Sequence, residues 1–164
     1  MKSPLHSKNK SVYLSLGSNI GNSVENINKS IDLLSANTNI IFLEKSFYYN
    51  TEPLYNANQA NFVNIVIKLS TNITALDLLK ICKNIEINVG RNIYDIKNSP
   101  RIIDIDILVY GKDIIKSNKL IIPHPKITER KFVLQPWFDI DSNFIVPGIN
   151  KKIKLLLKNV KDNS

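Results

Sequence analysis

Four stretches of the chain alternate apolar side chains with polar or small ones at the period of two that is typical of a β-strand. They span residues 11–16, 39–49, 62–70 and 100–110, and the second of them is predicted to be one long strand. A polar segment that contains Pro53 runs from Thr51 to Ala60 and is expected to form a loop.

Two segments carry apolar residues at helical spacing, and each follows a residue that is suited to cap a helix. Asn22, with Glu25 three residues later, predicts the start of the first helix, and Thr74 with Asp77 predicts the start of the second. Gly90 predicts where the second helix ends, because glycine accepts the left-handed conformation that closes many helices.

The last third of the chain has weaker signals. Residues 120–122 are predicted to add a short strand, and Pro123-His124-Pro125 a rigid corner. Residues 129–137 look partly helical until Pro136 intervenes, and residues 153–160 have the pattern of a short amphipathic helix.

The predicted order is strand, helix, strand, strand, helix, strand, which is the split β-α-β arrangement of ferredoxin-like folds. We therefore expect an α+β fold with a ferredoxin-like βαββαβ core, a mainly antiparallel sheet, helices packed on it and a C-terminal extension. Residues 1–10 are polar and rich in lysine, so a flexible tail is expected there, and residues 11–160 are expected to form a single domain.

Composition narrows the class of protein. The chain has 164 residues, of which 43% are hydrophobic, an ordinary balance for one globular domain. No apolar run approaches the roughly 18 residues that a membrane helix needs. Cys82 is the only cysteine, which excludes an intramolecular disulfide. A cytoplasmic monomer without membrane partners is expected.

The formal net charge of +8 is compatible with nucleic acid, an anionic surface or a phosphate-rich small molecule as the partner. The kind of positive charge is more informative than the total, because the chain has only three arginines, Arg91, Arg101 and Arg130, among many lysines. Arginine offers a planar, bidentate donor that lysine cannot copy. We expect at least two of the three to bind phosphate.

Two carboxylates interrupt the last of the four predicted strands. Asp104 and Asp106 share one face of it, with Cα atoms about 6.5–7 Å apart, because successive side chains alternate between faces. Carboxylates at that distance repel each other unless a cation lies between them, and Mg²⁺ accepts one or two carboxylates together with phosphate oxygens. Arg101 adds a phosphate-binding group upstream. The pattern alone fits a strand with a solvated polar face equally well.

Several short motifs occur together in a fixed order. They are Gly17-Ser18-Asn19, Thr51-Glu52-Pro53-Leu54, Phe62-Val63-Asn64, Glu86 with Gly90-Arg91, Arg101-Ile102-Ile103-Asp104-Ile105-Asp106, and Pro123-His124-Pro125 with Arg130 and Phe132. From about Val12 to Gly148 the chain resembles the 6-hydroxymethyl-7,8-dihydropterin pyrophosphokinase family of folate biosynthesis. The resemblance implies a Mg-dependent transfer of pyrophosphate from ATP to the hydroxymethyl group of the pterin, with release of AMP.

The resemblance also implies roles for individual residues. Asp104 and Asp106 would hold two Mg²⁺ ions, and Arg91 and Arg101 would join them as catalytic residues, with ATP as co-substrate. The implied ATP contacts are Glu86, Arg91, Arg101, Ile107, His124 and Arg130. The implied pterin contacts are Thr51, Leu54, Phe62, Asn64 and Phe132.

Some of these residues have a structural alternative. Phe62 and Phe132 taken singly are more typical of a core, but together with Asn64 they favour a site for a flat, polar-edged ring. An isolated histidine beside prolines, as His124 is, is usually structural. Glu86 either binds the nucleotide or orients an arginine, and the sequence leaves both open.

The chain departs from the family in one loop. The family usually has a second basic residue two positions after Arg91, where this chain has Ile93, and Trp-Gly before the arginine that corresponds to Arg101, where it has Asn98-Ser99. Lys97 compensates in part. We expect intact substrate binding but slower or leakier closure of this loop.

Two other functions compete with this interpretation. A ferredoxin-like module can bind RNA on sheet aromatics, but the RNP1 pattern is absent and two carboxylates would repel phosphate without a metal, so no nucleic-acid partner is expected. A different Mg-dependent transferase would also use a D-x-D pair. A P-loop enzyme is excluded, because no G-x-x-x-x-G-K-[ST] sequence occurs.

Overall fold

The computed structural model of the chain describes residues 8–53, 58–92, 94, 96, 97 and 99–161. Its elements are β1 (Lys10–Ser18), α1 (Ser23–Ser35), β2 (Ile40–Lys45), β3 (Tyr49–Thr51), β4 (Phe62–Thr71), α2 (Ala75–Val89), β5 (Asp104–Tyr110), β6 (Ile115–Lys116), β7 (Ile121–Ile122), a 3₁₀ turn (Ile127–Glu129), α3 (Lys131–Asp141) and α4 (Ile153–Asn159). The expected flexible tail lies mostly outside the described residues, and its last residue, Lys10, already pairs with Thr71 in the sheet.

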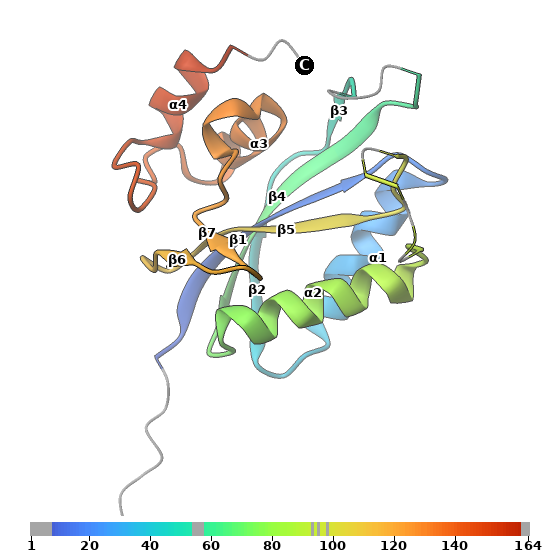
Figure 1. Cartoon of the computed structure of the whole chain (residues 1–164), viewed down its shortest axis with the longest axis horizontal. Coiled ribbons are helices and arrows are strands. Elements are labelled where there is room, and N and C mark those ends of the chain that lie inside the picture. Colours follow the sequence, from blue (N-terminus) through green and yellow to red (C-terminus); the bar gives the residue numbers. More distant parts are fainter. Residues whose placement is uncertain (1–7, 54–57, 93, 95, 98, 162–164) are drawn as a thin grey trace, which may run out of the picture.

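The main sheet has the order β2-β4-β1-β5, and β3 continues beside β4 where β2 ends (Figure 1). Every pair in it is antiparallel. This order and the α1 and α2 connections confirm the predicted α+β fold with a ferredoxin-like core. No helix in the described part of the chain is both long and apolar enough to cross a bilayer.

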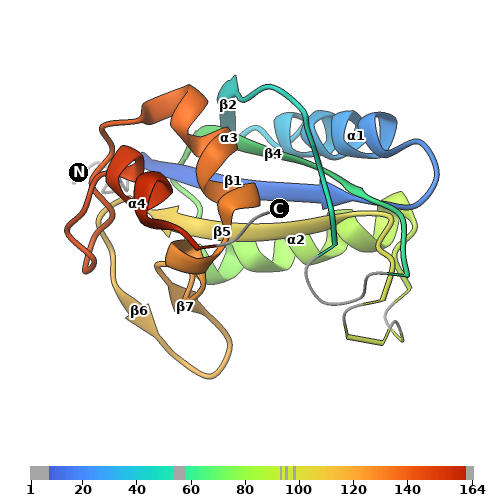
Figure 2. The same cartoon turned by 90° about the horizontal axis from the view of Figure 1, so that it is seen from above.

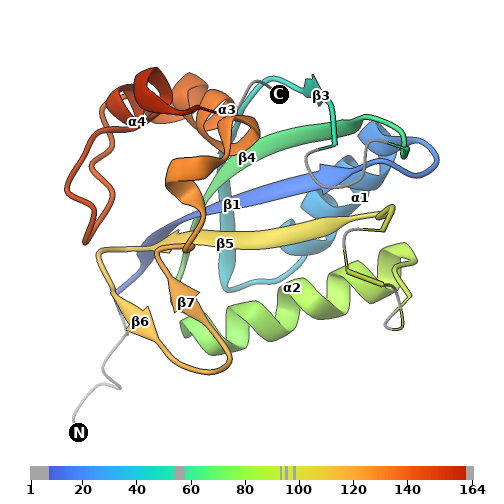
Figure 3. The same ribbon diagram turned by 45° about the horizontal axis from the view of Figure 1, so that its top comes forward.

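Each face of the sheet has its own hydrophobic core. On β1, Val12, Leu14 and Leu16 join the core beneath α1 and α2. Tyr13 points to the other face, where its ring lies 5.1 Å from that of Trp137 on α3. Figures 2 and 3 show α1 and α2 on one side of the sheet and α3 with α4 on the other. The helices α3 and α4 cover only one end of their face.

The capping signals of both predicted helices are confirmed. The Asn22 side chain accepts a hydrogen bond from the backbone N–H of Glu25 at 3.1 Å, and Thr74 accepts one from Asp77 at 3.2 Å. Gly90 ends α2 with a φ of 126°, a conformation that favours glycine. The chain can therefore turn sharply after α2 and bring Arg91 back toward β5.

The single long strand predicted over residues 39–49 is wrong, because the chain leaves the ladder between β2 and β3. At the break, the Ser46 hydroxyl accepts the N–H of Val66 at 3.0 Å, a donor that a strand carbonyl would otherwise take. The register also shifts between Phe42 and Glu44. The two halves of the strand are thereby turned relative to each other, and β3 pairs with the start of β4.

One expectation for the last third is corrected, and another is confirmed with an addition. Pro136 does not end the helix, since α3 continues to Asp141. Val133, Leu134 and Trp137 are buried on this helix, and that burial offsets the hydrogen bond that proline cannot donate. The predicted short strand is confirmed as β7, but its partner β6 was not predicted.

Candidate active site

A cavity of about 240 Å³ opens at the end of the sheet where β1 ends and β5 begins, on the face that carries α3. Nine of the residues expected at the site line it: Thr51, Phe62, Asn64, Arg91, Arg101, Asp104, Asp106, Arg130 and Phe132. Strands β3, β4 and β5, the end of α2 and the start of α3 thus contribute to one cavity.

The two aspartates point into this cavity from β5. Asp104 and Asp106 lie on one face of the strand, whereas Ile103, Ile105 and Ile107 are buried in the core under the helices. On the neighbouring strand, Gly17 stands opposite Asp104 and Ser15 stands opposite Asp106. These small residues leave room beside both carboxylates.

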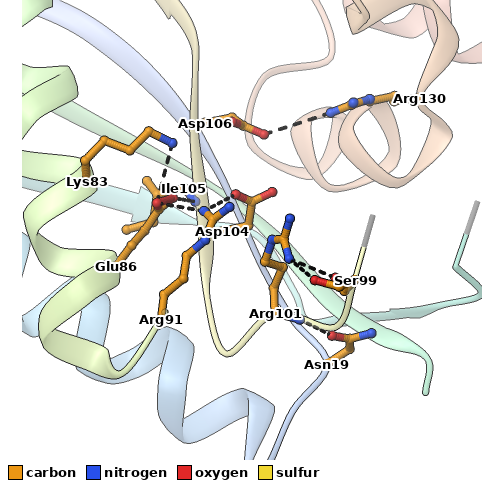
Figure 4. A network of polar contacts seen from close by, with 10 residues as sticks. All are labelled: Asn19, Lys83, Glu86, Arg91, Ser99, Arg101, Asp104, Ile105, Asp106 and Arg130. Carbon is orange, nitrogen blue, oxygen red and sulfur yellow. Dashed lines mark hydrogen bonds and ion pairs between the residues drawn. The ribbon is translucent and has the colours of Figure 1, made fainter. Parts of the chain in front are cut away.

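The three arginines approach the carboxylates from different elements, as Figure 4 shows. Nη1 of Arg91 lies 3.0 Å from an Asp104 oxygen, and Nη1 of Arg130 lies 3.9 Å from an Asp106 oxygen. The Arg101 guanidinium instead donates to the carbonyl of Ser99 at 3.2 Å. The cavity wall is therefore a mixed array of positive and negative groups.

Burial, and then the charge of Asp104, raises the pKa of Asp106 to about 7, although Arg130 acts in the opposite direction. The Asp106 side chain keeps 31% of its surface accessible, but that surface faces the cavity. The position thus favours either a proton or a cation next to this oxygen. Among the described residues, no third His, Cys, Asp or Glu completes a metal cluster here. Two carboxylates beside a space for phosphate oxygens are a donor set that fits Mg²⁺.

Glu86 lies behind β5 with only 2% of its side chain exposed. Its Oε1 accepts the N–H of Ile105 at 2.9 Å, and its Oε2 lies 2.8 Å from Nη1 of Arg91. Burial raises the pKa of Glu86, and the bond from Ile105 opposes that shift. Since β5 is an edge strand, this carboxylate takes up a backbone donor that the sheet leaves unpaired. Both oxygens of Glu86 thus bind protein groups.

The other wall of the cavity is formed by paired strands. Thr51 on β3 stands opposite Phe62 on β4, and the Asn64 amide donates to the Thr51 hydroxyl at 2.6 Å. A Cβ on Gly17 would lie 2.6 Å from the Asn64 amide oxygen, so only glycine leaves space for this side chain. The Arg130 guanidinium lies 5.5 Å from the centre of the Phe132 ring, within cation–π distance.

Three of the expected ATP contacts, Glu86, Ile107 and His124, are not among the residues that line the cavity. The Ile107 side chain is 4% exposed and packs under the helices. Its backbone shares the outer edge of β5 with that of Ile105, because backbone groups alternate sides along a strand. The backbone N–H of His124 donates to Leu108 on the same strand at 2.9 Å. A nucleotide would therefore meet these residues along the outer edge of β5 and not inside the cavity.

His124 is neutral near pH 7. Burial, and next the charge of Arg130, lowers the pKa of the imidazole to about 4. Its Nδ1 accepts the N–H of Lys126 at 3.1 Å, so the proton of the neutral ring sits on Nε2.

Some positions were not predicted, and others are not described. Ser15 and Gln59 line the cavity although no expectation named them, and Glu52, Pro53, Lys97 and Ser99, which were named without an individual substrate contact, line it too. Ser15 carried a usable signal, because strand alternation places it on the same face as Gly17. Leu54, Ile93 and Asn98 lie outside the described residues.

Comparisons with known proteins show which family the chain belongs to. The sequence pattern of the 7,8-dihydro-6-hydroxymethylpterin-pyrophosphokinase (HPPK) family matches residues 13–142. The 2-amino-4-hydroxy-6-hydroxymethyldihydropteridine pyrophosphokinase of Haemophilus influenzae is 34% identical over 151 residues, which cover 92% of this chain and 93% of that enzyme. The Folic acid synthesis protein FOL1 of Dictyostelium discoideum is 43% identical over 155 residues, which cover 92% of this chain but 23% of that protein.

A solved structure shows the same fold. The crystal structure of wild-type Plasmodium falciparum HPPK-DHPS with pteroate superposes on 92% of this chain with a TM-score of 0.73 and 17% sequence identity. The superposition covers 42% of that protein. The chain thus spans less than a quarter of FOL1 and less than half of the Plasmodium protein. From the family match and the full-length bacterial relative, the chain belongs to the 7,8-dihydro-6-hydroxymethylpterin-pyrophosphokinase family.

Proposed function

We propose that the chain transfers pyrophosphate from ATP to the hydroxymethyl group of 6-hydroxymethyl-7,8-dihydropterin and releases AMP, as a step of folate biosynthesis. The observation that carries the proposal is that one cavity joins two walls of different chemistry. Asp104 and Asp106 line it together with arginines, and Phe62 and Asn64 line it from β4. A charged nucleotide tail and a flat ring with polar edges need these two kinds of wall.

In this reaction the hydroxymethyl oxygen forms a bond to the β-phosphorus of ATP. The bond from that phosphorus to the oxygen bridging it to the α-phosphorus breaks, AMP leaves with the electron pair, and the hydroxyl proton passes to water. Such transfers depend on positioning and on cancelling charge at the phosphate oxygens. Arg91 and Arg101, which line the cavity, would contact these oxygens, and Arg130, 3.9 Å from Asp106, would do the same from the opposite side.

Asp104 and Asp106 are the residues that would hold Mg²⁺. Two such ions, when bound, would cancel charge on the triphosphate and polarise the pterin hydroxyl. The raised pKa of Asp106 supports this role, since burial and then the Asp104 charge favour a positive group at this carboxyl, and a cation would replace the proton. Glu86 we assign to holding Arg91 and the backbone of β5, because both of its oxygens bind protein groups.

The pterin would lie between Phe62 and Phe132, with the Asn64 amide at its polar edge and Thr51 holding that amide. Leu54, outside the described residues, would add a contact from the same loop. The adenine would lie along the outer edge of β5 at Ile107, where the Nε2–H of His124 is a donor. We expect the protein to act as a cytoplasmic monomer without nucleic acid.

For the altered loop before Arg101, slower or leakier closure over the substrates stays our prediction. Lys97 and Ser99 from this loop line the cavity, so a basic group and a hydroxyl are present on that wall. Single-turnover and steady-state rates, measured beside a relative that has both missing groups, test the prediction. Equal rates for chemistry and product release would refute it.

AMP release is the assay that tests the proposed function. Purified protein with ATP and Mg²⁺ should form AMP only after 6-hydroxymethyl-7,8-dihydropterin is added, and EDTA should stop it. Formation of ADP would indicate a different transferase. Tight RNA binding that persists in EDTA, without pterin-dependent AMP, would favour the RNA-binding module.

A further inference from the structure

Asn19, in the turn after β1, connects two segments that are far apart in the sequence. The side-chain Oδ1 of Asn19 accepts the backbone N–H of Arg101 at 2.7 Å, and the backbone N–H of Asn19 donates to the Arg101 carbonyl at 2.9 Å. Its Nδ2 donates to the Gln59 side chain at 2.7 Å and to the Ala60 carbonyl at 3.0 Å. The side chain therefore uses both its acceptor and its donor, and only 6% of the residue is exposed.

This contact is separate from the cap of α1. The cap of α1 is Asn22, three residues later. Asn19 is thus available for the two connected segments, and Figure 4 shows its side chain directed at the backbone of Arg101.

The two connected segments belong to opposite walls of the cavity. Gln59 lines the wall that carries Phe62, and Arg101 lines the wall that carries Asp104. Neither Gln59 nor Arg101 lies in a strand, so the register of the sheet does not set the distance between them. The Asn19 amide supplies a connection that the sheet does not.

We propose that Asn19 is a positioning residue that fixes Arg101, and through it the phosphate wall, relative to the pterin wall. The inference rests on the proposed function. The reacting oxygen comes from one wall and the phosphorus from the other, and a displacement of about 1 Å costs on the order of 10²-fold in rate. Arg101 is itself 9% exposed, so losing Asn19 would also leave its backbone N–H without an acceptor in a buried place.

The test compares variants that remove either the donor of the Asn19 side chain alone or both its donor and its acceptor. Asn19→Asp keeps an acceptor for Arg101 and loses the donor to Ala60, whereas Asn19→Ala loses both. We expect kcat to fall about tenfold in the first and about 10²-fold in the second, with KM for ATP and for the pterin within threefold of the parent. Asn22→Asp is the matched control, since aspartate caps helices as well as asparagine does, and its kcat should not change. Thermal melting establishes that each variant is folded at the assay temperature.

A double-mutant cycle separates positioning from general damage. If Asn19 acts through Arg101, Asn19→Asp should change kcat less than twofold in an Arg101→Ala background. Additive losses, or a parental kcat in Asn19→Ala, would overturn the proposal.

Amide hydrogen exchange at Arg101 tests the contact without any turnover. We expect exchange to accelerate at least tenfold in Asn19→Ala and to stay near the parental rate in Asn19→Asp. Unchanged exchange in Asn19→Ala of an active enzyme would overturn the inference alone. A parent protein that forms no pterin-dependent AMP would overturn the proposed function, and the positioning role with it.

Discussion

The two walls of the cavity differ in what holds their side chains in place. On the pterin wall, Phe62, Asn64 and Thr51 sit in strands whose ladder fixes their spacing. On the phosphate wall, Arg91 and Arg130 are held by ion pairs with carboxylates, and Arg101 lies outside the strand. Ion pairs can exchange partners when a charged substrate enters, whereas a ladder cannot. The comparison predicts that substitutions in the phosphate wall lower turnover, whereas substitutions in the pterin wall lower the affinity for the pterin.

The largest effect should come from the carboxylates of the phosphate wall. Asp104→Asn or Asp106→Asn should lower kcat about 10³-fold, close to 4 kcal/mol of transition-state stabilisation, because charge on the triphosphate is no longer cancelled. Pterin affinity, measured by calorimetry, should stay within threefold. Turnover within a few-fold of the parent in either variant would show that these residues hold no metal.

Arg101→Lys tests whether the shape of the cation matters on the same wall. Lysine keeps the charge but loses the planar, two-donor fork, so we expect a loss of about 1–3 kcal/mol in kcat/KM for ATP. Pterin binding in the absence of ATP is the internal control and should not change. A kcat/KM equal to that of the parent would mean that Arg101 acts only as a point charge.

Gly17→Ala should act on the pterin wall. The new Cβ would lie 2.6 Å from the Asn64 amide oxygen, and moving the amide away would break the bond that its Nδ2–H donates to the Thr51 hydroxyl. Losing one recognition hydrogen bond of about 1.5 kcal/mol should raise the KM for the pterin about tenfold. KM for ATP should not change. An equal rise in both constants would contradict the separation of the two walls.

The smallest effect concerns pH and stability at His124. Because its pKa in the folded protein is about 4 and its usual value is 6.5, its contribution to stability is present above pH 6.5 and is lost as the pH falls toward 4. The charges of Arg130 and Lys126 lower the pKa of the ring and that of Asp104 raises it. His124→Asn keeps an acceptor for the Lys126 N–H and removes the titration. Between pH 6.5 and pH 4, the melting temperature of the variant should fall less than that of the parent. Parallel melting curves would contradict this prediction.

Periodic patterns predicted much of this molecule. Alternation placed Asp104 and Asp106 on one face, because side-chain direction along a strand depends only on position. The caps at Asn22 and Thr74 were predictable because capping is a contact between near neighbours in sequence.

Contacts between distant segments were not predictable. The break at Ser46 depends on its hydroxyl meeting Val66, which no local pattern records. The continuation of α3 past Pro136 depends on burial against the sheet. The roles of Glu86 and Asn19 depend on backbone donors of Ile105 and Arg101, which lie 19 and 82 residues away in sequence.

The products of a reaction with equimolar ATP and 6-hydroxymethyl-7,8-dihydropterin test the central claim most directly. With Mg²⁺ present, ³¹P NMR should show AMP and the pterin diphosphate in equal amounts, without ADP or free pyrophosphate, and the Asp106→Asn variant should leave ATP intact over the same period. Formation of ADP, pterin-independent AMP, or a parental rate in Asp106→Asn would contradict the account.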